Sequence, residues 1–167
     1  METLSVQDNR LYSLVTLLDW QTNFFKSAID GISGIDLHNR LDTKANHVGW
    51  LAGSIVQQRY ELSQYLSKDN SLTQQAHHLF SNNQGIKENA AYPSAEQYAQ
   101  DWEAITPKLR EALVAADTQT LDTSIDMGGM QMTFLEWLTF SVYREASQIG
   151  QIALWRRLLG YEAMKYM

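Results

Sequence analysis

Apolar residues recur at steps of three and four along four long segments of the chain, the pattern of helices that bury one face. The expected helices cover about residues 8–30, 43–67, 94–116 and 133–160. Four amphipathic helices, with no internal repeat and no convincing sheet, predict an all-α four-helix bundle. The 167 residues suit a single helical domain, residues 1–167, that buries one substantial core.

Several residues mark the expected ends of these helices. Asp8 is a good N-cap for the first helix, and Ser94 opens the third in a capping box, Ser-Ala-Glu-Gln, that follows a proline. Thr133 with Glu136 forms the same signature for the last helix. Before it, residues 124–132 predict a brief extended excursion with a turn at the glycine pair 128–129. Pro107 falls inside the third helix and predicts a kink or a local loosening.

The longest irregular stretch lies between the second and third helices, over residues 68–93. Residues 71–80 could form a short helix, and the rest is polar and rich in turn formers. Loops of this length are more often functional lids or rims than plain connections. His77 and His78 lie in this loop, but adjacent residues point to different sides of a helix, so they make a poor metal pair.

Two features of the helices concern packing. Gly49, Ala52 and Gly53 make one side of the second helix small, which lets a neighbour approach closely, although each glycine costs about 1 kcal/mol in helix propensity. Trp20 and Phe24 lie outside the narrowest apolar stripe of the first helix. They either widen that stripe or mark a subunit contact, and widening is the favoured interpretation.

The composition of the chain argues against several classes of function. The chain has no cysteine, which excludes disulfides, thiolate nucleophiles and Cys-ligated zinc. Its net charge is −6 with dispersed basic residues, so a nucleic-acid partner is not expected. The basic pair Arg156–Arg157 is best explained by the negative end of its own helix dipole. No signal peptide or apolar run of about 18 residues is evident, so a cytoplasmic location without membrane contact is expected.

The last helix has a polar middle between apolar ends. Ser141, Arg144, Glu145 and Gln148 interrupt its buried side, so this cluster either lines a pocket or replaces a once reactive site. No catalytic triad, phosphate-binding glycine loop or metal-ligand pair accompanies it. His47 precedes Ser54 by seven residues, roughly 10 Å along the helix, and cannot stand in for it.

Three segments resemble the DinB-like family of four-helix bundles, which includes metal-dependent thiol transferases that use bacillithiol or mycothiol. They are YREASQIGQIALWRRLLG in the last helix, NHVGWLAGS in the second and YPSAEQYAQDWEAI at the start of the third. The family commonly carries H-x-x-x-H-x-G-Q on the last helix and one histidine after a W-x-x-G segment on the second. Gly150 and Gln151 match the first frame, and Trp50 and Gly53 match the second. The resemblance implies a DinB-like fold with a long loop between the second and third helices.

The three metal-ligand positions of that family depart from its pattern, because they hold Ser54, Arg144 and Gln148. Serine is a weak neutral ligand, arginine keeps its charge, and glutamine binds zinc poorly. We therefore expect neither the family's metal nor its Lewis-acid chemistry, and no cofactor.

Arg144 would then supply the positive charge of the cavity, oriented by Glu145. An internal salt bridge or hydrogen-bond network explains the arginine without a ligand and is preferred, because a paired buried charge needs none. The alternative is a pocket that binds a small anionic or carboxylate-bearing molecule. The candidate pocket residues are Ser54, Arg144, Glu145, Gln148, Trp50 and Gln151.

Three functions stay open at this point. The chain is either a metal-free small-molecule-binding protein or a dimeric scaffold without catalysis. The third possibility is an enzyme, either with Glu145 as general acid or base or with residual thiol-transferase-like chemistry of the family. The family resemblance implies a homodimer, which the aromatic helix faces permit.

Overall fold

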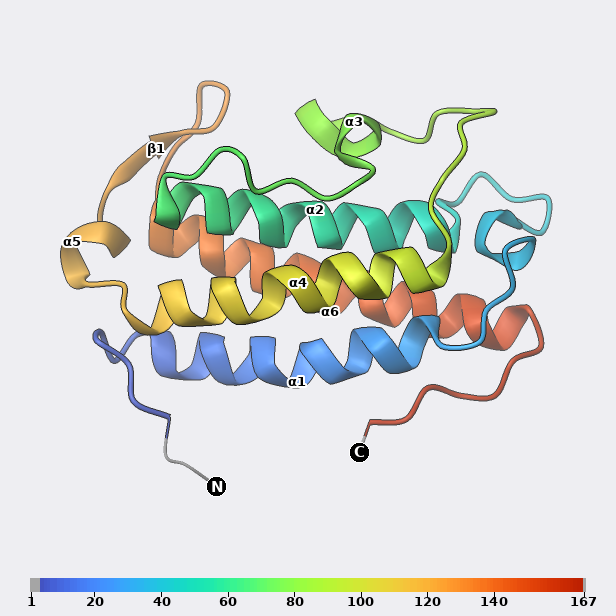
Figure 1. Cartoon of the computed structure of the whole chain (residues 1–167), viewed down its shortest axis with the longest axis horizontal. Coiled ribbons are helices and arrows are strands. Elements are labelled where there is room, and N and C mark those ends of the chain that lie inside the picture. The colour runs from blue at the N-terminus through green and yellow to red at the C-terminus, as the bar shows by residue number, and fades with distance from the viewer. Residues whose placement is uncertain (1–3, 167) are drawn as a thin grey trace.

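The computed structural model describes residues 4–166, and four long helices dominate it (Figure 1). They are α1 (Leu11–Ile29), α2 (Val48–Ser67), α4 (Ala95–Val114) and α6 (Phe134–Leu158). The predicted all-α bundle is confirmed. The helix positions follow from the apolar periodicity, and the ends differ from the prediction by a few residues.

The order of the helices creates one long crossover. The end of α1 leads through η1 (Asp36–His38) into α2, which runs antiparallel to it. The chain then returns from the end of α2, along the bundle, to start α4 beside the beginning of α2. Consequently α2 and α4 run in the same direction, as do α1 and α6. Each helix packs against two neighbours, in the ring α1–α6–α2–α4.

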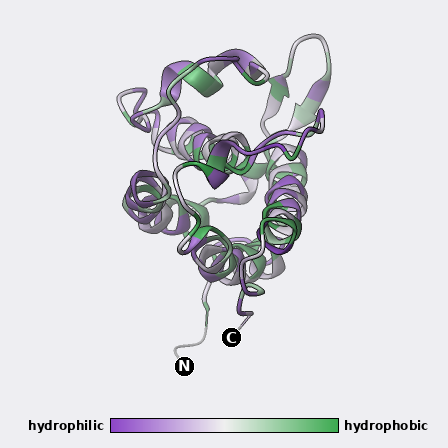
Figure 2. Cartoon of the chain, turned by 90° about the vertical axis from the view of Figure 1, so that its right-hand side faces the viewer, coloured by the Kyte–Doolittle hydropathy of each residue, from purple (hydrophilic) through white to green (hydrophobic). Residues whose placement is uncertain are grey.

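The crossover and a hairpin cover the same side of the bundle, whereas the described ends of the chain lie on the other (Figure 2). The crossover contains α3 (His77–Phe80) and η2 (Ser81–Asn83). After α4 and the short α5 (Thr118–Leu121), strands β1 (Ser124–Asp126) and β2 (Gln131–Thr133) form the predicted excursion. They pair antiparallel with Ile125 opposite Met132, and both glycines of the turn have positive φ.

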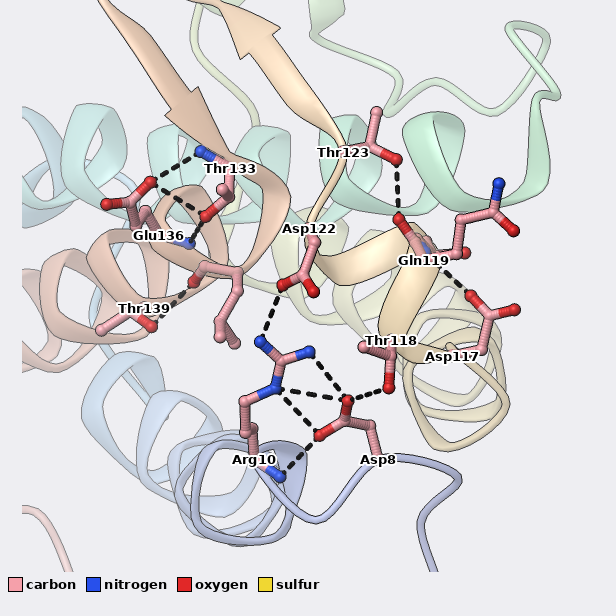
Figure 3. Close-up of polar contacts among 12 residues, drawn as sticks. Asp8, Arg10, Asp117, Thr118, Gln119, Asp122, Thr123, Thr133, Glu136 and Thr139 are labelled. Atoms are coloured by element: carbon pink, nitrogen blue, oxygen red, sulfur yellow. Dashed lines mark hydrogen bonds and ion pairs between the residues drawn. The ribbon is translucent and has the colours of Figure 1, made fainter.

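The start of α1 differs from the prediction. Asp8 is not the N-cap, because the helix begins at Leu11 after Arg10. The Asp8 carboxylate instead accepts hydrogen bonds from the backbone and side chain of Arg10 and from Thr118 (Figure 3). The bonds from Arg10 hold the pKa of Asp8 well below its usual range. Since Arg10 also contacts Asp122 at 2.7 Å, this cluster joins the start of α1 to the segment around α5.

The start of α2 is also later than predicted. Leu41 and Asp42 form a turn with φ angles of 46° and 58°, and residues 43–45 are bends, so the helix starts only at Val48. His47 is the N-cap, and its Nδ1 accepts the N–H of Trp50 at 3.0 Å. The predicted caps at the other helices are confirmed. Ser94 accepts the N–H of Gln97, and Thr133 forms a complete capping box with Glu136.

The core gathers the apolar stripes of the four helices in two clusters, one toward each end of the bundle. The rings of Trp102 and Phe25 pack at a tilt of 36° with centroids 4.3 Å apart. The helix α4 continues through Pro107 without interruption. Trp20 does not widen the buried stripe of α1, because it is 57% exposed. Phe24 does contribute, since it packs on the core and on the ring of Tyr166.

Gly53 permits the close approach that small residues on α2 predicted. A Cβ there would overlap the Phe80 ring of the crossover and would lie 2.8 Å from Tyr98 of α4. The close neighbours are therefore α4 and the crossover together.

Arg156 has a different role from the one expected. It is buried and donates to the carbonyls of Ala28 and Asp30, at the end of α1, and to that of Glu162. It thus satisfies another helix's free carbonyl groups, while Arg157 remains exposed. Within residues 4–166 no helix is both long enough and apolar enough to cross a membrane.

Candidate functional site

The structure brings Ser54, Arg144 and Gln148 together between α2 and α6. The Arg144 Nη2 donates to Ser54 Oγ at 2.5 Å, and Nη1 donates to Gln58 Oε1 at 2.8 Å. With its amide turned so that the oxygen faces Arg144, Gln148 accepts from Nη2 at 3.2 Å and donates to the Leu51 carbonyl at 3.2 Å. The three positions matched to metal ligands therefore converge on one point, as the helix frames predicted.

Arg144 carries a positive charge that its bonded partners do not neutralise. All three are neutral oxygens, and the ion pairs among residues 4–166 do not include it. Burial lowers the pKa of Arg144, and the negative charge of Glu61 opposes that shift. A guanidinium has five N–H donors, so the bonds to α2 and to Gln148 leave donor capacity free.

Glu145 does not orient Arg144, which corrects the expectation from sequence. It is completely buried and pairs with Arg59, whose side chain is only 2% exposed. The pair is bidentate, with Arg59 Nη2 to Glu145 Oε1 at 2.6 Å and Nε to Oε2 at 2.9 Å. Glu145 is therefore part of the core and contributes no wall to a pocket.

Arg59 has a full set of partners besides Glu145. Its Nη1 donates to the hydroxyls of Thr22 and Thr106, and its Nη2 donates to the Leu18 carbonyl. Its guanidinium carbon lies 3.5 Å from the centre of the Trp102 ring. This pair links all four helices. The apolar pattern does not single out Arg59, although its position, four residues after Ile55 and three before Leu62, lies on the buried stripe of α2.

A pocket of about 220 Å³ opens beside Arg144. Its wall combines one face of α2 with the crossover and Arg144, and it is lined by Trp50, Ser54, Gln57, Glu61, Phe80, Gln84 and Arg144. Of the candidate residues, Trp50, Ser54 and Arg144 line it, whereas Gln151 is exposed on α6 outside it. The indole N–H of Trp50 is buried without an acceptor among the described residues.

Gln57 and Glu61 were missed, although a sequence signal for them exists. Together with Trp50 and Ser54 they fall at steps of four, three and four along α2, and so on one face. Phe80 comes from the crossover, whose path no helical periodicity predicts. Two larger hollows, of about 550 and 510 Å³, lie beside Trp20 and beside Asp30 and contain none of the matched positions.

We take the smaller pocket as the candidate site, because it borders Ser54 and Arg144 and carries two opposite charges.

The histidines form no metal cluster with one another. His77 contacts Gln57 with its Nδ1 at 3.1 Å, whereas His78 is exposed on the other side of α3. Across residues 4–166, no group of three or more His, Asp or Glu side chains is arranged to hold a metal ion.

No protein-family model and no curated protein matches the sequence. Among solved structures, a DinB-like protein, YjoA from Bacillus subtilis, matches with a TM-score of 0.65 over 92% of this chain and 96% of that chain. The two sequences are 16% identical, so the similarity concerns the fold. The resemblance found in the sequence is thus confirmed at the level of architecture, and the chain adopts the DinB-like helical fold.

Proposed function

We propose that this chain binds a small carboxylate-bearing molecule in the pocket at Arg144. The observation that carries the proposal is a half-buried guanidinium whose bonded partners are all neutral and which borders a cavity. A carboxylate accepts charge-assisted hydrogen bonds from such a group more strongly than a neutral oxygen does.

The partners of Arg144 also favour binding over a purely structural role. Ser54 and Gln58 hold two nitrogens of the guanidinium from α2, which fixes its plane before any ligand arrives. A donor that is already ordered loses less entropy on binding. Burial already disfavours the charged form of Arg144, and a bound anion would relieve that cost.

Isothermal titration calorimetry with acetate, butyrate and benzoate tests this function. We expect saturable binding to the native chain and at least a tenfold loss of affinity in Arg144→Gln, because a charge-assisted hydrogen bond contributes about 1.5–3 kcal/mol. Arg157→Gln, which removes an exposed charge from the same helix, is the matched control and should bind normally. Binding that survives Arg144→Gln, or the absence of carboxylate binding, would overturn the proposal.

A dimeric scaffold is a second candidate, which one observation favours. Phe140, Tyr143, Leu154 and Leu158 are all exposed, and their spacing places them along the outer side of α6. Solvent-facing apolar side chains in a row are typical of protein contacts. Light scattering coupled to size exclusion would show a dimer that Tyr143→Glu with Leu154→Glu dissociates, and a monomer in the native chain would remove this candidate.

A further inference from the structure

Glu61 is a positioned carboxylate in the same pocket as Arg144. Its Oε1 accepts a hydrogen bond from Gln57 Nε2 at 3.0 Å. The oxygen of the Gln57 amide accepts from Gln74 Nε2 at 2.9 Å and is 3.1 Å from His77 Nδ1. Because α3 and the crossover hold that oxygen, the amide nitrogen must face Glu61.

The two charges of the pocket are close enough to interact, because Glu61 acts on the pKa of Arg144, but they are not bonded to one another. Arg144 is bonded to Ser54 and Gln58, and Glu61 is bonded to Gln57, so each charge has neutral partners and neither belongs to an ion pair of the described residues. Gln58, which accepts from Arg144, is three residues before Glu61 on α2, roughly 4.5 Å along the helix axis. The pocket therefore presents a cation and an anion at different points along one helix face.

This arrangement discriminates between classes of ligand. A simple anion would gain from Arg144 but would be repelled by Glu61, and a simple amine would meet the reverse. A molecule with both charges satisfies both groups. Trp50 and Phe80 add aromatic surface. The methylene groups of such a molecule can pack on these rings, and its ammonium group can lie over a ring face. The volume of about 220 Å³ corresponds to roughly seven water molecules, so the ligand is small.

We propose that the ligand is a small zwitterionic amino carboxylate, with its carboxylate on Arg144 and its ammonium group on Glu61. This proposal rests on the proposed function, since it assigns the second charge of the molecule that Arg144 binds.

Calorimetry with molecules of matched length separates the two proposals. Butyrate, 4-aminobutyrate and butylamine share a four-carbon chain and differ in charge, and the series from glycine to 6-aminohexanoate varies the charge separation. We expect 4-aminobutyrate or a longer homologue to bind about tenfold more tightly than the carboxylate of equal length, the effect of one charge-assisted bond.

The variant Glu61→Gln keeps the shape of the side chain and removes its charge. It should bring the zwitterion and the plain carboxylate to equal affinity, while Arg144→Gln should weaken both. Glu111→Gln, at an exposed position of α4 outside the pocket, is the matched control and should change neither. The comparison of ligands on the native chain requires no variant to fold.

Three other results would contradict one or both proposals. Equal binding of butyrate and 4-aminobutyrate to the native chain would overturn the zwitterion proposal and leave carboxylate binding intact. Binding of butylamine that depends on Glu61 but not on Arg144 would overturn both proposals in favour of a cation site. Absence of binding by every molecule in the series would also overturn both.

Discussion

Two arginines between the same helices show opposite ways of keeping a charge inside a protein. Arg59 is almost completely buried and has a bidentate carboxylate, two hydroxyls, a carbonyl and an aromatic face around it. Arg144, one helix away, is half-buried and has only neutral oxygens. The first arginine has no capacity left for a ligand, and the second has both free donors and an adjoining cavity.

Polar side chains on the buried side of a bundle helix therefore do not by themselves mark a functional site. Glu145 and Arg144 are adjacent in the sequence, yet one belongs to the core and the other to a pocket. A buried pair is costly to desolvate and costly to break, so removal of one member reveals its structural role. Removal of a charge without a bonded counter-charge leaves no ion-pair partner unpaired, so its substitution tests for binding more than for stability.

The largest expected effect is at the buried pair. Glu145→Gln leaves Arg59 charged and unpaired in the core, so we expect a loss of about 3–5 kcal/mol in the free energy of unfolding. Urea denaturation followed by circular dichroism measures it. The double variant Arg59→Met with Glu145→Leu should recover most of the loss, because an apolar pair needs no desolvation of charge. A loss below about 1 kcal/mol for Glu145→Gln would mean that the pair does not stabilise the contact of the four helices.

The second-largest expected effect is a gain of metal binding at the position of Arg144. Since Ser54, Arg144 and Gln148 converge, their joint replacement by histidine should create a three-ligand zinc site. Zinc at a hundred times its dissociation constant should then raise the free energy of unfolding by about 2.7 kcal/mol. Elemental analysis after dialysis measures the bound zinc.

The control retains Arg144 and replaces only Ser54 and Gln148 by histidine, and it should bind little zinc because the guanidinium occupies the site. A folded triple variant that fails to bind zinc would show that the matching of these positions to family ligands is wrong. Stoichiometric zinc or nickel in the native chain, purified without chelators, would reopen the metal-dependent thiol-transferase chemistry.

The four-helix bundle and the position of Arg144 opposite Ser54 could be predicted from the sequence. Apolar periodicity depends on local spacing, so it located all four helices, and the W-x-x-G and G-Q frames placed Ser54 opposite Arg144 and Gln148. It did not predict the start of α2, because residues 43–45 bend away from helical geometry and the cap is a histidine, which is not among the usual N-cap residues. The identity of the partner of Glu145 and the Phe80 wall depend on how distant segments meet, which periodicity does not contain.

A third buried titratable group sharpens the comparison, because its charge changes within an accessible pH range. His47 is 5% exposed and its Nδ1 caps α2. Burial, together with the positive charges of His38 and Arg40, lowers the pKa of His47 to about 4. The unfolded chain therefore takes up this proton more readily than the folded one, and the stability it contributes is complete above pH 6.5 and is lost as pH falls toward 4.

We expect the native chain to lose about 1.5 kcal/mol from this group between pH 6.5 and pH 5. His47→Asn keeps an N-cap oxygen but cannot titrate in that range, so it should flatten the dependence. Urea denaturation at both pH values measures the difference between the two proteins. Parallel pH profiles for native chain and variant would show that His47 is not the titrating group.

The smallest expected effect is the most informative about Arg144. Arg144→Gln should change the free energy of unfolding by only about 1 kcal/mol, because it breaks hydrogen bonds to neutral partners and no ion pair. The same substitution should abolish ligand binding. If it instead costs as much as Glu145→Gln, Arg144 is a structural tie between α2 and α6, and the pocket needs no ligand to explain its charge. A near-neutral change in stability together with lost binding would show that the fold keeps this arginine for what enters the pocket.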